Sequence, residues 1–265
     1  MILDKKLLTK QGYLNFNLKD LNENLFNEFK EHLTKKYLRT KINVLRADSI
    51  ILEKNLSKIK EIDDKFNVRT EGRDIEIEDS SYRKLQNKYY GNLDNLKEVN
   101  KYLASMDVTK TCGVGGGGQV WLYGPYRNMI PSKNNLIESL YLQTVVELYK
   151  DDIINHDEYQ IYKEQGSHTY IGAGTDITLY LKDNYISPHA DGIDGTRLCV
   201  LLMYLNDDWE NGYGGEIVVN NEITIPPLFG NIVILDFTQN NINHEVLNVI
   251  KENFERYAII KFFYK

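Results

Sequence analysis

Short runs of β-branched and aromatic residues fill the C-terminal part of the chain, and they constrain its fold more than any other feature. Clusters of glycine, asparagine, aspartate or proline separate the runs, without a helical pattern between them. Such runs favour strands, and such clusters favour turns. The runs are DITLYLK (176–182), RLCVLLMYL (197–205), GEIVV (215–219), NIVILDF (231–237) and RYAIIKFFY (256–264). Five strands at this density predict a compact antiparallel sandwich or barrel.

The first 110 residues differ in composition, being rich in Lys, Asn, Asp, Glu and Leu. Across residues 21–38 the apolar side chains fall near one helical stripe, as in an amphipathic helix. Three further segments also favour helix: residues 49–62, 82–106 and 139–154. We therefore predict a mostly helical N-terminal region, residues 1–110, followed by a β-rich region, residues 111–265.

Charge, cysteine content and hydropathy exclude several classes of protein. The chain carries 32 Lys and Arg against 38 Asp and Glu, a net charge of −6, so no global attraction to nucleic acid is expected. Two cysteines, Cys112 and Cys199, build neither a disulfide framework nor a four-thiolate zinc site. Because neither a signal peptide nor a membrane span is apparent, we expect a cytoplasmic protein without a membrane partner.

A glycine-rich run at residues 113–118 precedes an aromatic stretch. The run lacks the GK[ST] ending whose lysine and hydroxyl hold phosphate and magnesium, so a flexible loop is favoured over a phosphate-binding loop. The stretch that follows could line a peptide groove or pack as a core or lid. Its candidate residues are Trp121, Tyr123, Tyr126 and Arg127.

His189 forms an H-x-D motif with Asp191. Residues two apart on an extended segment project to the same side, so this imidazole and carboxylate can converge on one ion. A third ligand from another strand could complete the set, and His244 follows the strand-like run at 231–237. Two imidazoles and one carboxylate on one octahedral face suit non-haem Fe(II) and leave three positions open, although zinc or manganese could bind the same ligands.

Arg256 opens the last apolar run, twelve residues after His244. A guanidinium in an apolar strand is costly unless it pairs with an anion, and its planar fork matches a carboxylate. Taken alone, Arg256 is more readily explained by a salt bridge to a protein acid or by exposure to solvent. Beside a metal site, binding of a dicarboxylate cosubstrate is the better interpretation.

Residues 176–265 resemble the Fe(II)/2-oxoglutarate-dependent dioxygenases, particularly the prolyl 4-hydroxylases and, among them, the hypoxia-inducible-factor-type prolyl hydroxylases. The resemblance runs through HADGIDGTRLCVLLMYLNDDW, GYGGEIVV, IPPLFGNIVILDF, NHEV and RYAIIKFFY. It implies an α+β fold in which residues 111–265 form a double-stranded β-helix, or jelly roll, supported by N-terminal helices. It also implies that His189, Asp191 and His244 are the catalytic residues and the iron ligands.

The resemblance further implies that Arg256 holds the distal carboxylate of 2-oxoglutarate. Tyr180 matches a tyrosine that helps to hold the same carboxylate, and Tyr185 is the competing candidate. The sequence departs from the family in one spacing: the basic residue usually follows the distal histidine by nine or ten positions, whereas here the gap is twelve. Lys251, within the intervening polar turn, is the second candidate anchor.

The activity implied is hydroxylation of an unactivated C–H bond with Fe(II), 2-oxoglutarate and O2, with ascorbate as an optional reductant. Asp191 at the carboxylate position favours hydroxylation over halogenation. The expected substrate is a prolyl residue in a peptide or protein; a free amino acid or other small molecule is the alternative with the same chemistry. Two alternatives from other classes are a non-catalytic cupin-like binding module and a zinc hydrolase.

Overall fold

The computed structural model describes the chain in thirteen stretches that together contain the β-rich core and the N-terminal helices. These are residues 2–41, 45–52, 61, 64–66, 69–75, 84–91, 98, 126–130, 135–149, 175–182, 184–191, 197–238 and 242–264. The glycine run at 113–118 and most of the aromatic stretch after it lie outside the described residues, as does Cys112.

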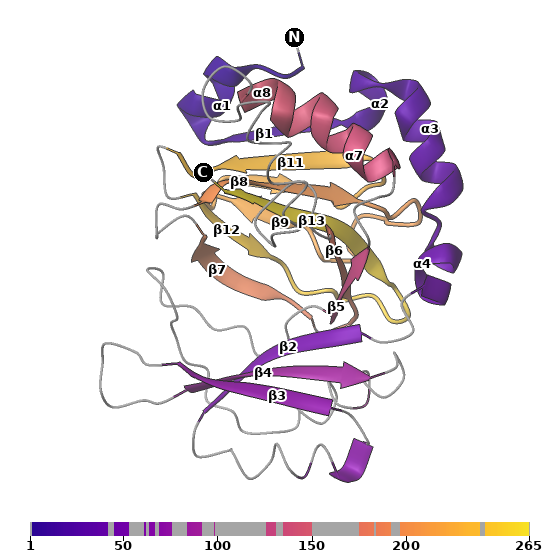
Figure 1. Ribbon diagram of the computed structural model, residues 1–265, viewed down its shortest axis with the longest axis vertical. Helices are drawn as coiled ribbons and strands as arrows, with labels where there is room; N and C mark the ends of the chain where they lie inside the picture. Colours follow the sequence, from indigo (N-terminus) through magenta and orange to yellow (C-terminus); the bar gives the residue numbers. More distant parts are fainter. Residues whose placement is uncertain are drawn as a thin grey trace.

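Eight of the described strands are divided equally between two antiparallel sheets that face each other (Figure 1), and successive strands alternate between the sheets except at β9 and β10, which pair with each other. The four-stranded sheet has the order β10-β9-β12-β7, and β11-β8-β13-β6 lie side by side in the larger sheet. The strands are β6 (Thr175–Tyr180), β7 (Ile186–Ala190), β8 (Arg197–Tyr204), β9 (Ile217–Val219), β10 (Ile223–Ile225), β11 (Asn231–Asp236), β12 (Asn243–Val246) and β13 (Arg256–Tyr264). This alternation is that of a jelly roll, so the predicted α+β fold with a double-stranded β-helix is confirmed.

Five more strands extend the larger sheet to nine within the described residues. β1 (Tyr13–Asn17) pairs with β11 at one edge, so the N-terminal region contributes a strand to the core sheet. Beyond β6, at the other edge, follow four strands in the order β5 (Tyr126–Ile130), β2 (Leu45–Leu52), β4 (Lys84–Gly91) and β3 (Arg69–Ile75). β2, β4 and β3 lie below the two facing sheets in Figure 1.

The prediction of a mostly helical region over residues 1–110 is contradicted at β2, β3 and β4, whereas the described residues 61, 64–66 and 98 are helical. Helix was expected over 49–62 and 82–106, but residues 49–52 and 84–91 of these ranges belong to β2 and β4, which pair antiparallel from Leu45↔Gly91 to Leu52↔Lys84. The local helical preference of the charged residues is weak, and pairing with a neighbouring strand overrides it. The proposed boundary at residue 110 falls outside the described residues.

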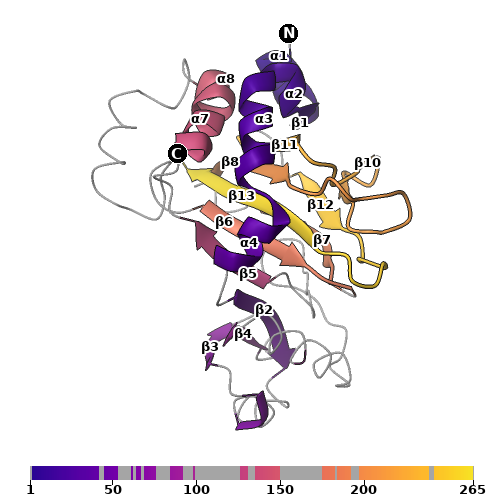
Figure 2. The ribbon, with the colours of Figure 1, turned by 90° about the vertical axis from the view of Figure 1, so that its right-hand side faces the viewer.

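Helices cover the face of the larger sheet opposite the four-stranded sheet (Figures 1 and 2). They are α1 (Lys5–Gln11), α2 (Leu18–Leu21), α3 (Glu23–His32), α4 (Lys35–Lys41), α7 (Asn135–Tyr141), a π-helical turn η2 (Leu142–Val146) and α8 (Glu147–Tyr149). The helix expected from residue 139 is confirmed as far as 149. α3 begins at the cap Asn22, whose side chain accepts a hydrogen bond from the Leu25 amide at 3.0 Å. None of the described helices is long and apolar enough to cross a membrane.

Both faces of β8 are buried, which explains its nearly continuous apolar sequence. Leu201 and Met203 pack with the helices, in a cluster that includes Phe29 of α3. Residues on the other face pack between the two sheets: Val200, Leu202 and Tyr204 of β8 with Ile217 and Val219 of β9. The candidate site lies at this interior between the sheets.

Candidate metal centre and anion pocket

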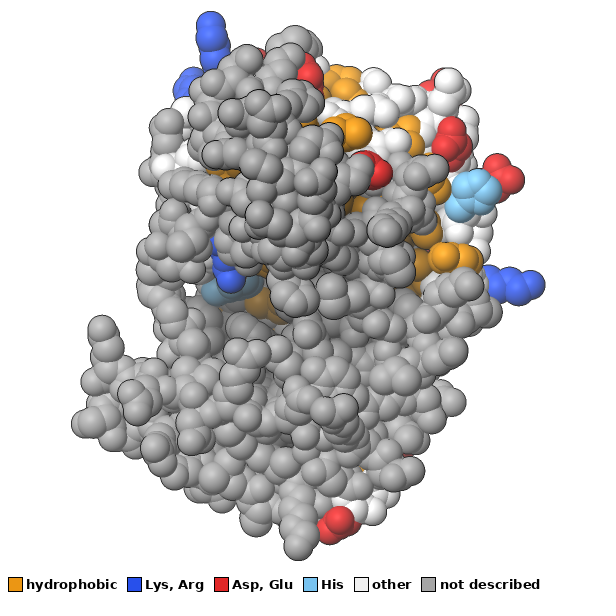
Figure 3. All heavy atoms as spheres, in the orientation of Figure 1, with side chains coloured by type: hydrophobic (Ala, Val, Ile, Leu, Met, Phe, Trp, Pro, Cys, Tyr) orange, Lys and Arg blue, Asp and Glu red, His pale blue; other side chains and the backbone are white. Residues whose placement is uncertain are grey.

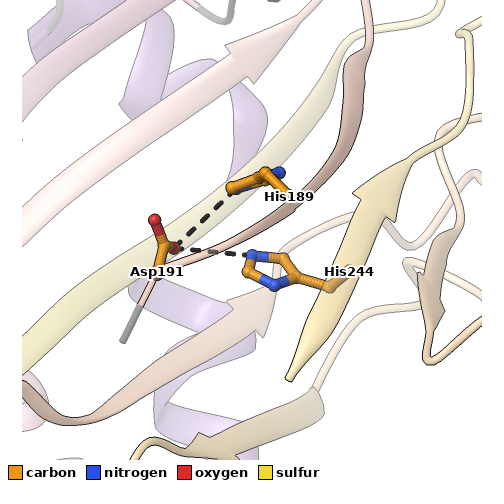
Figure 4. A group of neighbouring side chains, drawn as sticks. All are labelled: His189, Asp191 and His244. Atoms are coloured by element: carbon orange, nitrogen blue, oxygen red, sulfur yellow. Dashed lines mark ion pairs between the residues drawn. The ribbon is translucent and has the colours of Figure 1, made fainter. Parts of the chain in front are cut away.

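His189, Asp191 and His244 come together on the four-stranded sheet (Figure 4). β7 and β12 are antiparallel neighbours, and His189 lies directly opposite His244 in their register. Directly opposed side chains share one face of a sheet, and the two ring centroids are 4.2 Å apart. Asp191 follows the last residue of β7, and the potential ligand atoms of the three residues all lie within 4.8 Å of one another.

The two carboxylate oxygens of Asp191 have separate partners. Oδ2 faces the imidazoles, 3.5 Å from Nε2 of His244 and 3.8 Å from Nε2 of His189. Oδ1 accepts a hydrogen bond from Nη1 of Arg197 at 3.0 Å, and the same nitrogen donates to the Asp191 backbone carbonyl at 2.8 Å. Arg197 therefore fixes the rotation of the carboxylate, and Oδ2 is left to join the two Nε2 atoms around one ion.

The His244 ring is oriented by the backbone. Its Nδ1 lies 3.2 Å from the carbonyl oxygen of Ile242. Because a carbonyl oxygen only accepts hydrogen bonds, this contact favours the tautomer with its proton on Nδ1. Nε2 faces Asp191 and His189: when protonated it donates to the Asp191 carboxylate, and on losing that proton it can offer its lone pair to a metal ion. A carbonyl or carboxylate on the far nitrogen is the usual support of a metal-binding histidine.

Electrostatics keep Asp191 in the form that a metal requires. Burial by itself raises the pKa of this carboxyl, but a hydrogen bond and charge interaction with His244, together with the charges of His189 and Arg197, outweigh it. The net result is a pKa well below the usual range. Metal-binding carboxylates must be deprotonated, and at neutral pH this one is.

The cluster is accessible from the surface. The side chain of His189 is 16% exposed and that of Asp191 21%, whereas His244 is buried at 7%. In the orientation of Figure 1, Figure 3 shows histidine and Lys or Arg side chains inside a hollow of the molecular surface. Two histidines and one carboxylate with an open side leave room for further ligands, unlike a closed structural zinc site.

Arg256 forms the second half of the site. It is the first residue of β13 and lies opposite Tyr180 of β6 in register. Its neighbour two positions on, Ala258, packs between the sheets, so the Arg256 side chain enters the same interior. The residue is 1% exposed. Its guanidinium carbon lies 4.5 Å from the Tyr180 ring centroid and 4.9 Å from that of Tyr204.

Two buried donors in this pocket lack partners among the described residues. Nε of Arg256 donates to the Gly215 carbonyl at 2.5 Å, but Nη2 has no hydrogen-bond partner there. The Tyr204 hydroxyl is also buried without one, and burial raises its pKa to about 12, so it is a protonated donor at neutral pH. Leaving such groups unpaired is costly, and an anion bound between them would satisfy both donors. A guanidinium edge beside a hydroxyl fits a carboxylate.

Residues 175–264 match the family described as the 2OG-Fe(II) oxygenase superfamily. These residues form a 2OG-Fe(II) oxygenase domain. The match spans β6 to β13 and therefore includes both the histidine–aspartate cluster and Arg256. An oxygenase of this superfamily requires Fe(II), 2-oxoglutarate and O2, so the chain is an enzyme and an oxidoreductase.

Comparison with solved structures returns prolyl hydroxylases at low identity. A prolyl hydroxylase from Trichoplax adhaerens, in complex with a peptide fragment of the hypoxia inducible factor oxygen degradation domain, is 14% identical; the match covers 100% of this chain and 87% of that one, with a TM-score of 0.47. A prolyl-4-hydroxylase from Pseudomonas putida is 13% identical, with 98% and 97% of the two chains covered and a TM-score of 0.43. No curated protein sequence matches significantly.

The structure brings together most of the residues that the sequence singles out for the oxygenase domain. His189, Asp191 and His244 form one cluster, and Tyr180 packs against Arg256. Their roles as ligands and anchors stay predictions. Tyr185, the competing tyrosine, is half-buried in the segment between β6 and β7.

Lys251, the alternative anchor, lies away from the pocket. It is exposed in the turn before β13, where its Nζ lies 5.2 Å from the Tyr213 ring centroid. The two or three extra residues of the twelve-residue spacing are therefore accommodated in a surface turn, and β13 still presents Arg256 inward.

Sequence reasoning missed Tyr204 and Arg197. Tyr204 stands in an apolar run, where a core tyrosine is the ordinary interpretation, and only the strand order β8-β13-β6 brings it beside Arg256. Arg197 opens the same run, six residues after Asp191, and its guanidinium donates hydrogen bonds to the Asp191 side chain and backbone. Both residues could have been noted from the sequence as polar side chains within, or at the start of, an otherwise apolar predicted strand.

Proposed function

We propose that the protein is an Fe(II)- and 2-oxoglutarate-dependent dioxygenase that hydroxylates an unactivated C–H bond, with a prolyl residue in a peptide or protein as the leading substrate. The observation that carries this proposal is the pairing of two features in one domain. A two-histidine, one-carboxylate cluster lies within 4.8 Å, and a buried guanidinium has an unpaired nitrogen. The first feature suits Fe(II), and the second suits the far carboxylate of 2-oxoglutarate.

In this proposal, Nε2 of His189, Nε2 of His244 and Oδ2 of Asp191 hold the iron. When bound, iron and 2-oxoglutarate together supply oxygen activation, at the expense of decarboxylation to succinate and CO2. The chain's own residues supply geometry and charge. Arg197 holds the Asp191 carboxylate in its rotamer, and the Ile242 carbonyl holds the His244 ring.

Arg256 would bind the distal carboxylate of 2-oxoglutarate through its unpaired Nη2, and the Tyr204 hydroxyl would donate a second hydrogen bond. Tyr180, stacked on the guanidinium at 4.5 Å, would keep water from one of its faces. The apolar surroundings of the pocket strengthen each of these contacts relative to water.

The assignment of a prolyl substrate depends on the motif resemblance of residues 176–265 to prolyl 4-hydroxylases. A free amino acid or other small molecule fits the same metal chemistry, and nucleic acid is not expected from the net charge of −6. We also propose a cytoplasmic location and stimulation by ascorbate.

Succinate release tests the reaction class. The purified full chain with Fe(II), ascorbate and O2 should convert 2-oxoglutarate to succinate slowly alone and faster with proline-containing peptides. Peptides with proline replaced by alanine are the control. Stimulation by free proline but not by peptides would favour the small-molecule alternative. Lack of succinate under every condition would favour a cupin-like binding module, and hydrolysis of an added peptide in the absence of oxygen would favour a zinc hydrolase.

Replacing Arg197 by methionine should weaken Mn(II) binding by about tenfold to a hundredfold, the usual loss when a residue that supports a metal ligand is removed. The reason is that the Asp191 carboxylate then rotates freely. Mn(II) electron paramagnetic resonance titration measures the affinity. Lys182→Met, which removes a basic residue from an exposed ion pair with Glu252, is the matched control. Equal Mn(II) affinity in Arg197→Met and the wild type would contradict the supporting role.

A further inference from the structure

The backbone of Gly215 contacts the guanidinium of Arg256. Its carbonyl accepts the hydrogen bond from Nε at 2.5 Å. A guanidinium held at Nε cannot rotate about its last bond, so the direction of Nη2 is fixed by the position of the Gly215 backbone. The direction of the unpaired donor is thus set by a residue that is neither a metal ligand nor an anion ligand.

The backbone at Gly215 approaches Arg256 more closely than any side chain would permit. A Cβ atom at this position would lie 2.7 Å from Cδ and 3.2 Å from Nε of Arg256, and 3.2 Å from Cγ2 of Val249. Contacts under 3.0 Å are essentially never tolerated, so a methyl group here must displace the arginine or the backbone. The φ angle of +81° also favours glycine at this position.

Hydrogen bonds on both sides of Gly215 restrict movement of its backbone away from Arg256. Gly214 forms an antiparallel bridge with Val249, and its carbonyl accepts from Nε1 of Trp209 at 3.0 Å. On the next residue, the Glu216 carbonyl accepts from the Leu247 amide at 2.9 Å. Among the described residues, the guanidinium of Arg256 contacts the Gly215 carbonyl and the Tyr180 and Tyr204 rings, and its charge interacts with the Tyr204 hydroxyl; these contacts are made by side-chain atoms that can shift more easily than the paired backbone. An added methyl group should therefore push the guanidinium rather than the backbone.

We infer that Gly215 is a positioning residue that sets the affinity for the distal carboxylate of the cosubstrate and the preference for a 2-oxo acid that carries one. This inference rests on the proposed function, because it assumes that Arg256 binds that carboxylate. Gly215 acts only through Arg256, and it leaves the histidine–aspartate cluster untouched.

The test compares two 2-oxo acids on the full-length Gly215→Ala variant loaded with Mn(II), by isothermal titration calorimetry. 2-Oxopentanoate has the chelating end of 2-oxoglutarate but lacks the distal carboxylate. The Kd of 2-oxoglutarate should rise about tenfold to a hundredfold, the loss expected when a hydrogen bond to a charged group is weakened or lost. The Kd values of 2-oxopentanoate and of Mn(II) itself should stay at their wild-type values.

Gly212→Ala is the matched control. Gly212 has a φ of +91°, so alanine brings a comparable backbone strain, but no atom lies within 4 Å of the position that the added methyl group would take. This variant should bind both 2-oxo acids as the wild type does. If Gly215→Ala fails to fold, Gly215→Ala/Val249→Ala, which removes the second close contact, should show the same selective loss relative to Val249→Ala alone.

The outcomes separate the two proposals. Unchanged 2-oxoglutarate affinity in Gly215→Ala would overturn the positioning role, and so would an equal loss for both 2-oxo acids, which indicates a general structural defect. If the wild-type protein with Mn(II) does not prefer 2-oxoglutarate over 2-oxopentanoate, the failure lies in the proposed function instead.

Discussion

His244→Ala should lower the affinity for Fe(II) or Mn(II) by more than about a hundredfold and reduce turnover to background. Removing a residue that merely supports a ligand already costs about tenfold to a hundredfold, so removing a ligand should cost more. His244 is 7% exposed and its ring is pinned by the Ile242 carbonyl. A metal titration followed by a succinate assay measures both effects.

The control for this loss is another histidine. His32 lies in the last turn of α3 and is exposed, so His32→Ala should keep wild-type metal binding and turnover. Thermal unfolding of both variants without metal checks that the fold is retained. Wild-type metal affinity in a folded His244→Ala protein would contradict the account.

Asp191→Asn separates charge from shape at the same centre. The amide is nearly isosteric with the carboxylate and can still accept a hydrogen bond from Arg197, but it lacks the negative charge that neutralises a divalent ion. We expect metal affinity to fall nearly as far as in His244→Ala. A folded Asp191→Asn protein with full metal affinity would indicate that the carboxylate is structural.

Arg256→Met should raise the Kd of 2-oxoglutarate at least about thirtyfold, while metal affinity stays unchanged. Truncating one partner of a buried, hydrogen-bonded charge pair costs about 2 kcal/mol or more, and about 1.4 kcal/mol corresponds to tenfold in affinity. Calorimetric titration of the Mn(II)-loaded variant measures the change. Lys251→Met is the control, because this lysine is exposed in the turn before β13. A large effect of Lys251→Met and none of Arg256→Met would contradict the assignment of the anchor.

In the absence of cosubstrate, Arg256→Met should be at least as stable toward unfolding as the wild type. Nη2 of Arg256 is buried without a partner among the described residues, and a buried charge without its counter-ion costs stability. Methionine fills a similar volume without that cost. The free-energy penalty at Arg256 would then be the cost of a preformed binding site, as is common where stability and activity conflict. Tm of the two proteins, with and without 2-oxoglutarate, measures this balance.

The sequence predicted the β-rich core well because its strands are short, strongly apolar and separated by turn residues. β8, β11 and β13 coincide with three of the predicted runs. The juxtaposition of His189 and His244 could be expected only through a family resemblance. No local pattern says that β7 and β12, about fifty residues apart in the chain, become neighbours.

The remaining features could not be predicted, for identifiable physical reasons. β2 and β4 carry charged residues that are also common in helices, and they form strands because they pair with each other and with β5 and β3. The roles of the Tyr204 hydroxyl and of the Gly215 carbonyl could not be predicted, because both depend on their contacts with Arg256, which β13 brings close to them. The periodicity of a sequence predicts local secondary structure, but it does not predict which side chains from separate strands come into contact.

A crystal grown without oxygen in the presence of Mn(II) and 2-oxoglutarate tests the central claim most directly, through the anomalous scattering of the metal. The account predicts one Mn(II) bound by Nε2 of His189, Nε2 of His244 and Oδ2 of Asp191, with the far carboxylate of 2-oxoglutarate on Arg256. Manganese bound elsewhere, or a His244 ring turned away from the ion, would contradict it.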